Sequence, residues 1–277
     1  MVTKIIACAD IHIPTYKGID DVKKVLSTFI EQCKEIVKEN GKAETRIVVC
    51  GDLVHNKISI TNESVLATHW LLQQLNSICK TIVIAGNHDF LVNNMDRVDS
   101  IKPILEIGSL KNVTYLDAKL NYKSGILMDD NIAWCLYSSF DEFNRPDITF
   151  FKGAKKDENL TYVGLIHGDV NGAITATNYV VEHGLDGGVF EGCDFVIAGH
   201  IHKRQEIKKN GVKIVYCSSL KQTNMGESVS GHGFVLWDVE KKEYEYVDTP
   251  NEDSGYYKFE IYGIDDINED YEELINL

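Results

Sequence analysis

Five short apolar runs in this chain each end in a motif of aspartate, asparagine or histidine, and glycine accompanies four of these motifs. Continuous apolar runs are typical of strands buried on both faces, and in α/β sheets ligands bind outside the carboxyl ends of such strands. Residues far apart in the sequence can therefore converge at one edge of a sheet. The motifs, in chain order, are Asp10 with His12, Gly51 with Asp52, residues 86–89 (Gly-Asn-His-Asp), His167 with Gly168, and residues 199–202 (Gly-His-Ile-His).

The spacing of the apolar runs predicts β-α-β units. Apolar residues recur at helical spacing over residues 19–37 and again over residues 62–79, and these two helices alternate with the first three predicted strands. Residues 140–156, which contain proline and glycine, are predicted to form a loop. Because parallel units and hairpins both occur, we predict an α/β fold with a two-layered mixed β core flanked by helices. The predicted strands lie at residues 4–9, 47–50, 81–85, 113–116, 132–137, 162–166, 194–198, 212–217, 234–239 and 244–247.

Composition is typical of a globular protein with reduced cysteines. The chain has 277 residues, of which 44% are hydrophobic, and this is enough for a sizeable core. It shows no apolar run long enough to span a bilayer and no signal-peptide pattern, so we expect no membrane association and a cytoplasmic location. The seven cysteines include no Cys-x-x-Cys pair and mostly lie in apolar runs, which argues against disulfides or a zinc knuckle.

The negative charge is concentrated near the C-terminus. The chain carries a net charge of −14, and residues 248–277 hold ten acidic residues and one lysine, a net of −9. We therefore predict two units: a main domain over residues 1–247 and an acidic C-terminal extension over residues 248–277. The overall charge does not exclude nucleic acid as a substrate, because bound divalent cations are the largest local charges in such a site.

Convergence of the five motifs would gather carboxylates, one amide and several imidazoles. Mixed oxygen and nitrogen donors without thiolate favour Mn²⁺, Fe, Zn²⁺ or Co over Ca²⁺ or Mg²⁺. Two ions need a bridging anion, and Asp52 is our candidate, because a carboxylate can bridge where a neutral imidazole cannot. Each motif alone also has a structural interpretation: Asp10 could cap a turn, Asn87 could adopt left-handed backbone, and His167 could be a hydrogen-bonded histidine at a strand end.

Taken together, the motifs resemble those of the calcineurin-like metallophosphoesterase superfamily, which are D-x-H, G-D, G-N-H, H and G-H-x-H. The resemblance covers about residues 3–240 and implies an αββα sandwich with two bound divalent ions, Mn²⁺ being our first choice. It also implies that the ions clamp the substrate phosphate and activate a water that attacks phosphorus in line. Asn87 and His88 would then differ in role, with His88 as the general acid or transition-state stabiliser. The implied ligands are Asp10, His12, Asp52 and His202 for one ion, and Asp52, Asn87, His167 and His200 for the other.

The sequence after Asp52 separates branches of this superfamily. Protein phosphatases continue as G-D-x-x-D-R-G, whereas this chain reads Gly-Asp-Leu-Val-His over residues 51–55. That pattern is similar to the double-strand-break repair nucleases of the SbcD type and to the phage recombination endonuclease subunit. A G-H-I-H-x-x-Q motif ending at Gln205 and a G-E pair ending at Glu227 also resemble that branch, although Cys-Ser-Ser at residues 217–219 replaces its P-G-S turn. The resemblance implies a metal-dependent DNA nuclease, exonuclease or endonuclease, of a repair or recombination complex.

The branch normally continues into a DNA-binding cap and a helical segment that docks on an SMC-like ABC ATPase of the SbcC type. We interpret residues 248–277 as a remnant of that cap or as a tail that docks on a partner. The implied partners are DNA and such an ATPase, and a homodimer is compatible with the resemblance. Candidate substrate contacts are His55, Lys203 and Arg204. Two alternatives remain open: a phosphodiesterase or phosphatase acting on small nucleotides, and a catalytically silent scaffold.

Overall fold

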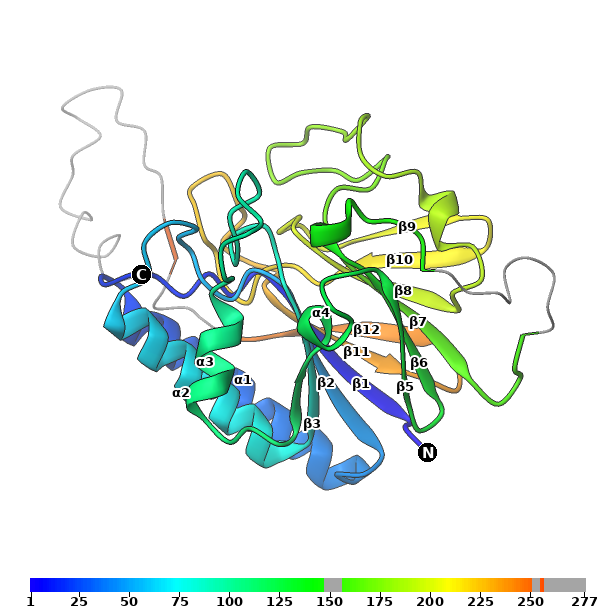
Figure 1. Cartoon of the computed structure of the whole chain (residues 1–277), viewed down its shortest axis with the longest axis horizontal. Helices are drawn as coiled ribbons and strands as arrows, with labels where there is room; N and C mark the ends of the chain where they lie inside the picture. The colour runs from blue at the N-terminus through cyan, green and yellow to red at the C-terminus, as the bar shows by residue number, and fades with distance from the viewer. Residues whose placement is uncertain (147–155, 251–254, 257–277) are drawn as a thin grey trace, which may run out of the picture.

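The computed structural model describes residues 1–146, 156–250 and 255–256. Two six-stranded mixed β-sheets pack against each other, and the two longest helices cover the outer face of one of them (Figure 1). This arrangement confirms the predicted α/β class with a two-layered mixed β core. Among the described residues, no helix is both long and apolar enough to cross a membrane.

The first sheet contains the three strands that precede the first three motifs. Strands β1 to β4 are parallel to one another, and β11 joins the sheet antiparallel to β1. Its members, in spatial order, are β12 (Glu243–Asp248), β11 (Gly233–Asp238), β1 (Lys4–Cys8), β2 (Thr45–Cys50), β3 (Lys80–Ile84) and β4 (Val113–Tyr115).

The second sheet contains the strands that precede the last two motifs. Four of its strands are parallel, and both edge strands, β5 and β9, run antiparallel to their neighbours. Its members, in spatial order, are β5 (Gly125–Asp129), β6 (Ile132–Tyr137), β7 (Thr161–His167), β8 (Phe195–Gly199), β10 (Val212–Tyr216) and β9 (Gln205–Lys209).

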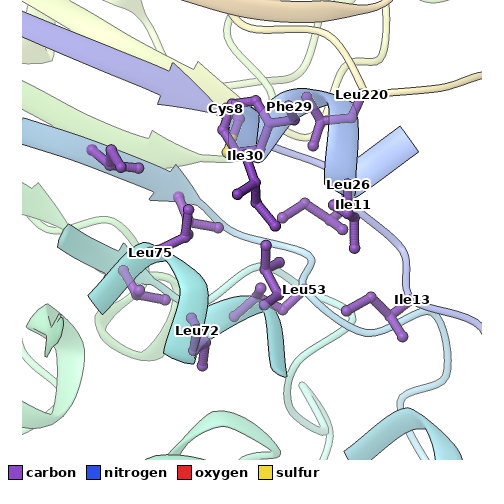
Figure 2. Packing of buried hydrophobic residues seen from close by; sticks show 14 of the residues in the cluster. Cys8, Ile11, Ile13, Leu26, Phe29, Ile30, Leu53, Leu72, Leu75 and Leu220 are labelled. Atoms are coloured by element: carbon purple, nitrogen blue, oxygen red, sulfur yellow. The ribbon is translucent and has the colours of Figure 1, made fainter. Parts of the chain in front are cut away.

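Helices α1 (Ile19–Asn40) and α2 (Asn62–Ile78) bury one apolar face each against the first sheet. Helix α2 begins with a capping box, in which the Thr61 side chain accepts from the Ser64 amide at 3.2 Å and the Ser64 hydroxyl accepts from the Thr61 amide at 3.1 Å. Figure 2 shows the packing of this layer, with side chains from both helices meeting those from the strand ends. The labelled members are Cys8, Ile11, Ile13, Leu26, Phe29, Ile30, Leu53, Leu72, Leu75 and Leu220.

A second core lies between the sheets, where Phe195 of β8 stacks on Trp237 of β11 with ring centroids 3.9 Å apart. A third core covers the outer face of the second sheet. There, Val181 and Phe190 come from residues 168–194, and the regular element in this segment is a short 3₁₀ helix (Gly187–Phe190) rather than an α-helix. Both sheets are therefore buried on both faces, as the continuous apolar runs indicate.

The structure also contains elements that apolar periodicity did not predict. The edge strands β5 and β9 are half-exposed, and the short helices α3 (Ile101–Ile107) and α4 (Leu116–Lys119) bury only two side chains each. Within the predicted loop at residues 140–156, a 3₁₀ turn (Ser139–Asp141) overlaps the first residues, and residues 147–155 lie outside the described part. The predicted boundary at residue 247 stays a prediction, since residues 257–277 also lie outside the described part of the chain.

The contact between α1 and the first sheet yields a stability prediction. Phe29 is fully buried, and its ring packs edge-on against Phe234 of β11 at a centroid distance of 5.4 Å. Phe29→Ala should lower the free energy of unfolding by about 3–5 kcal/mol, because it leaves a cavity that the helix cannot fill. Glu35→Ala, at an exposed position of the same helix, should change it by about 0.5 kcal/mol or less. Urea unfolding measures both, and equal effects would contradict this packing.

Candidate metal centre

The structure brings all seven predicted ligands together at the carboxyl ends of β1, β2, β3, β7 and β8. Two sets of ligand atoms form, and within each set the atoms lie within 4.8 Å of one another. The Asn87 Oδ1 atom lies 2.9 Å from Nδ1 of His200, next to the second set. The grouping matches the one that the resemblance implies, while ligation itself stays a prediction. The first set is Asp10, His12 and His202, and the second is Asp52, His167 and His200.

The backbone around these residues has an unusual conformation. Asp10, His12, Asp52 and His200 have φ values of 53°, 49°, 54° and 94°, a region that non-glycine residues seldom adopt. Backbone hydrogen bonds impose it: the Asp10 amide donates to the Gly51 carbonyl at 3.1 Å and the His12 amide donates to the Asp52 carbonyl at 3.0 Å. Such strain collects at functional sites, where the surrounding structure holds it in place.

Two glycines allow the motif loops to approach one another. A Cβ on Gly86 would lie 2.3 Å from the backbone nitrogen of Asp52, and one on Gly199 would lie 2.2 Å from the carbonyl oxygen of Cys50. Both contacts involve backbone, which cannot move aside. Only glycine fits at these two positions, because any side chain would push the β3 or β8 loop away from the β2 loop.

His167 shows that the site fits a metal ion. Its Nδ1 donates to the Cys50 carbonyl at 2.8 Å, so its Nε2 is directed at the carboxylates, 3.2 Å from Oδ2 of Asp52 and 3.8 Å from Oδ1 of Asp10. This Nε2 is buried and makes no hydrogen bond of regular geometry, so the Asp52 and Asp10 carboxylates are the groups it faces. A buried nitrogen in that state, beside two buried carboxylates, is what a metal ligand requires. Bound divalent ions would supply positive charge to a substrate phosphate and would activate water.

Burial and opposite charges together set the protonation of these groups. Burial opposes ionisation of Asp52, but the imidazoles of His167 and His12 hold the pKa of that carboxyl well below its usual range. Burial likewise opposes a charged imidazole, yet Asp52 raises the pKa of His167 to about 9 and Asp10 raises the pKa of His202 to about 10. Without metal, protons on these two histidines therefore compensate the buried carboxylates.

Glu227 is a functional residue whose role the sequence did not reveal. His202 Nδ1 donates to Oε1 of Glu227 at 2.7 Å, while the Thr223 amide and the Asn224 side chain donate to the same carboxylate at 3.0 and 2.6 Å. A carboxylate behind an imidazole fixes the ring and directs its other nitrogen at the metal. The G-E pair was visible in the sequence as a motif, but its contact with His202 was not.

Asp89 is a second residue whose role emerges only from the structure. Its buried carboxylate accepts from the backbone amides of Leu53 at 3.3 Å, Val54 at 3.1 Å and Gly86 at 2.8 Å. It therefore ties the loop after β2 to the loop after β3. Asp169 also lies next to the ligands, with its Oδ1 atom 3.6 Å from Nε2 of His200, and its position in the sequence did not mark it as a site residue.

The three candidate substrate contacts occupy different positions. His55 follows the β2 loop, and its carbonyl accepts from His88 Nδ1 at 2.5 Å. The exposed Lys203 Nζ donates to Asn178 Oδ1 at 2.9 Å, beside a cavity of about 300 Å³ that His202 also lines.

Arg204 lines that cavity too, but its guanidinium is engaged with β12. It donates to the Val247 carbonyl at 3.1 Å, pairs with Asp248 and lies over the Tyr246 ring at 5.1 Å. We therefore assign Arg204 to anchoring β12, and Lys203 stays the candidate for phosphate contact.

The position of Asp52 between the two ligand sets predicts how its loss affects metal binding. Asp52→Ala should reduce metal occupancy of both sites, because Asp52 Oδ2 lies 3.6 Å from His12 Nε2 and 3.2 Å from His167 Nε2. His12→Ala should weaken mainly one site. Elemental analysis of dialysed, Mn²⁺-loaded protein measures both, and full loading of Asp52→Ala would refute a bridging role.

The raised pKa values predict that metal binding releases protons. At pH 7, His167 and His202 are protonated in the metal-free chain, with pKa values of about 9 and about 10, but only neutral imidazole binds a metal. Mn²⁺ affinity should therefore rise with pH up to that range, and about two protons per chain should leave on loading. Calorimetric titrations in buffers of different ionisation enthalpy count these protons, and a release of none would contradict the assignment.

Comparison with known proteins is consistent with this geometry. A family model described as calcineurin-like phosphoesterase matches residues 3–204. An uncharacterized protein of Acanthamoeba polyphaga mimivirus is 32% identical over 254 residues, which cover 90% of this chain and 18% of that relative. The chain therefore spans less than a fifth of the length of this relative.

A solved structure of similar fold is among the matches. A dimetal phosphatase from Danio rerio superimposes with a TM-score of 0.52 at 12% identity, covering 85% of this chain and 92% of that one. An archaeal phosphodiesterase gives a TM-score of 0.40 at 14% identity, covering 87% and 97%. The family match spans all five motifs. With the ligand geometry described above, it shows that this chain belongs to the calcineurin-like phosphoesterase family.

Proposed function

We propose that this chain is a metal-dependent DNA nuclease that hydrolyses phosphodiester bonds in DNA repair or recombination. The proposal specifies a substrate, DNA, which the family assignment leaves open, and one observation supports it. Gln205 and Glu227, the residues through which the sequence resembles the double-strand-break nuclease branch, are both integrated into the site. Glu227 holds the metal-site histidine His202.

Gln205 holds a loop beside the candidate centre. Its amide group accepts from the Ile174 amide at 2.6 Å and donates to the Ile174 carbonyl at 2.8 Å, which is the pairing a strand would provide. Lys203 is bound to Asn178 in the same loop, and Tyr179 there is 57% exposed. An exposed ring and a lysine next to the metals suit a nucleic-acid strand, since bases stack on aromatic rings and lysine contacts phosphate.

Two hydrogen bonds of His88 support a role in proton transfer. Its backbone amide donates to Oδ1 of Asp52 at 2.7 Å, and its Nδ1 donates to the His55 carbonyl at 2.5 Å. A carbonyl only accepts, so Nδ1 carries a proton and Nε2 is left for the substrate. As a general acid His88 would donate from Nε2, and we assign it to the outgoing alkoxide oxygen.

This assignment predicts a substrate-dependent defect. His88→Ala should slow DNA hydrolysis by about 10²- to 10⁴-fold, because an alkoxide needs a proton to leave. It should slow hydrolysis of bis-p-nitrophenyl phosphate much less, because p-nitrophenolate leaves unprotonated. Elemental analysis of the Mn²⁺-loaded protein should find unchanged Mn²⁺ content. If both substrates slow equally, or if Mn²⁺ is lost, His88 is a ligand of the predicted centre or an orienting residue and the acid role is wrong.

Substrate preference tests the nuclease proposal itself. Mn²⁺-loaded protein should cleave duplex DNA ends and bis-p-nitrophenyl phosphate in preference to p-nitrophenyl phosphate, a monoester. His183→Ala, at an exposed loop histidine, serves as the control variant with wild-type rates. A monoester preference, or activity confined to small nucleotides, would overturn the nuclease proposal in favour of a phosphatase or a small-nucleotide phosphodiesterase. Absence of all activity in fully loaded protein would support a silent scaffold.

We further propose that an SMC-like ATPase partner provides the DNA clamp and that the acidic residues 248–277 contact a basic surface of it. Residues 257–277 lie outside the described part, so charge alone supports this step. Adding such an ATPase to the assay should stimulate degradation of long duplex DNA and leave hydrolysis of bis-p-nitrophenyl phosphate unchanged. Processive degradation by the chain alone would contradict the proposed need for a partner.

A further inference from the structure

A cluster of three histidines lies beside the two predicted metal sites. His12, His55 and His88 offer ligand nitrogens that all lie within 4.8 Å of one another. Their ring centroids are 5.4 Å apart for His12 and His55, 4.8 Å for His12 and His88, and 5.8 Å for His55 and His88. The cluster contains no carboxylate, which distinguishes it from the other two sets.

We propose that His12, His55 and His88 form a third metal site, which shares His12 with the first ligand set and competes with it, and which takes Zn²⁺ or a similar nitrogen-preferring ion. Imidazole suits Zn²⁺, Cu²⁺ and Ni²⁺, whereas Mn²⁺ favours oxygen donors. Three histidines with a fourth position open to water make a common tetrahedral zinc site. The site therefore selects against the ion that we expect in the centre itself.

The geometry needs only a small adjustment to bind zinc. Zn–N bonds of about 2.0–2.1 Å at tetrahedral angles place ligand nitrogens about 3.3 Å apart. The nitrogens of the three histidines need to approach by about 1.5 Å at most from the present spacing. His55 is exposed and His88 is half-buried, so side-chain rotation can supply this movement and solvent gives access to the ion.

Backbone contacts hold the three histidines on one surface. The His12 amide donates to the Asp52 carbonyl at 3.0 Å, and the His55 amide donates to the Ile13 carbonyl at 3.0 Å, so the segments after β1 and β2 stay paired. His88 is fixed to the same segment through the His55 carbonyl, which binds its Nδ1 and leaves Nε2 as the ligand atom. The buried His12 Nδ1 has no hydrogen-bond partner, so this atom does not restrain the rotation of the ring.

Zinc at this site would inhibit the enzyme. It would draw His12 from the first ligand set and His88 from the substrate. Both metal binding in that set and proton donation to the substrate would then be impaired. The effect on activity rests on the proposed function, since it needs the role that we assign to His88. Binding of the ion does not, and it can be measured separately.

The test compares zinc binding by Mn²⁺-saturated wild type and His55→Ala, using equilibrium dialysis against buffered free Zn²⁺ and elemental analysis. Wild type should bind one more zinc ion per chain than His55→Ala, and loss of that imidazole should weaken the binding at least about tenfold. His183→Ala, which removes an exposed histidine elsewhere, should bind zinc like wild type. Circular dichroism confirms folding, and if His55→Ala does not fold, His88→Ala should lose the same ion.

Inhibition provides the second measurement. Zn²⁺ should inhibit Mn²⁺-loaded wild type and His183→Ala at the same concentration, and His55→Ala, compared with its own uninhibited rate, should need at least about tenfold more. Equal zinc binding by wild type and His55→Ala would overturn the third site. Zinc bound at the third site of a chain that prefers monoesters would keep the site and refute only the nuclease proposal.

Discussion

The buried carboxylate of Asp52 is the interaction on which the candidate centre depends. Its Oδ1 accepts from the His88 amide of the β3 loop, and its Oδ2 lies between His12 from the first sheet and His167 from the second. A buried carboxylate needs compensating positive charge, and its partners here come from both sheets. The compensation of this one charge therefore links residues of the two layers at this edge. In the metal-free chain, protons on His167 and His202 provide this positive charge.

The packing of the sheets serves this placement. Strands β1, β2 and β3 end on one side of the interface, and β7 and β8 end on the other (Figure 1). The apolar core between the sheets, which includes the stacked rings of Phe195 and Trp237, determines how closely those ends approach. Glycine at positions 86 and 199 then removes the side chains that would hold the loops apart. The packing between the sheets and the two glycines therefore both favour the close approach of the motif loops.

Much of this could be predicted from the sequence, because buried parallel strands are continuous apolar runs and their carboxyl ends meet. Asp10, Asp52 and His167 were identifiable because each lies at the carboxyl end of such a run or within two residues of it. The contacts of Asp89 and Glu227 were not, since each depends on which loops face one another, a relation that no local pattern contains. Edge strand β9 carries charged residues and lacks an apolar run, so periodicity did not reveal it.

The central claim is that the two ligand sets bind a pair of ions bridged by Asp52. Electron paramagnetic resonance of the chain loaded with two equivalents of Mn²⁺ tests it most directly. Ions about 3.5–4 Å apart, the separation usual in two-metal sites, should give the spectrum of an exchange-coupled Mn²⁺ pair, and Asp52→Ala should abolish that coupling. A spectrum of isolated Mn²⁺ ions at full loading of the wild type would contradict the account.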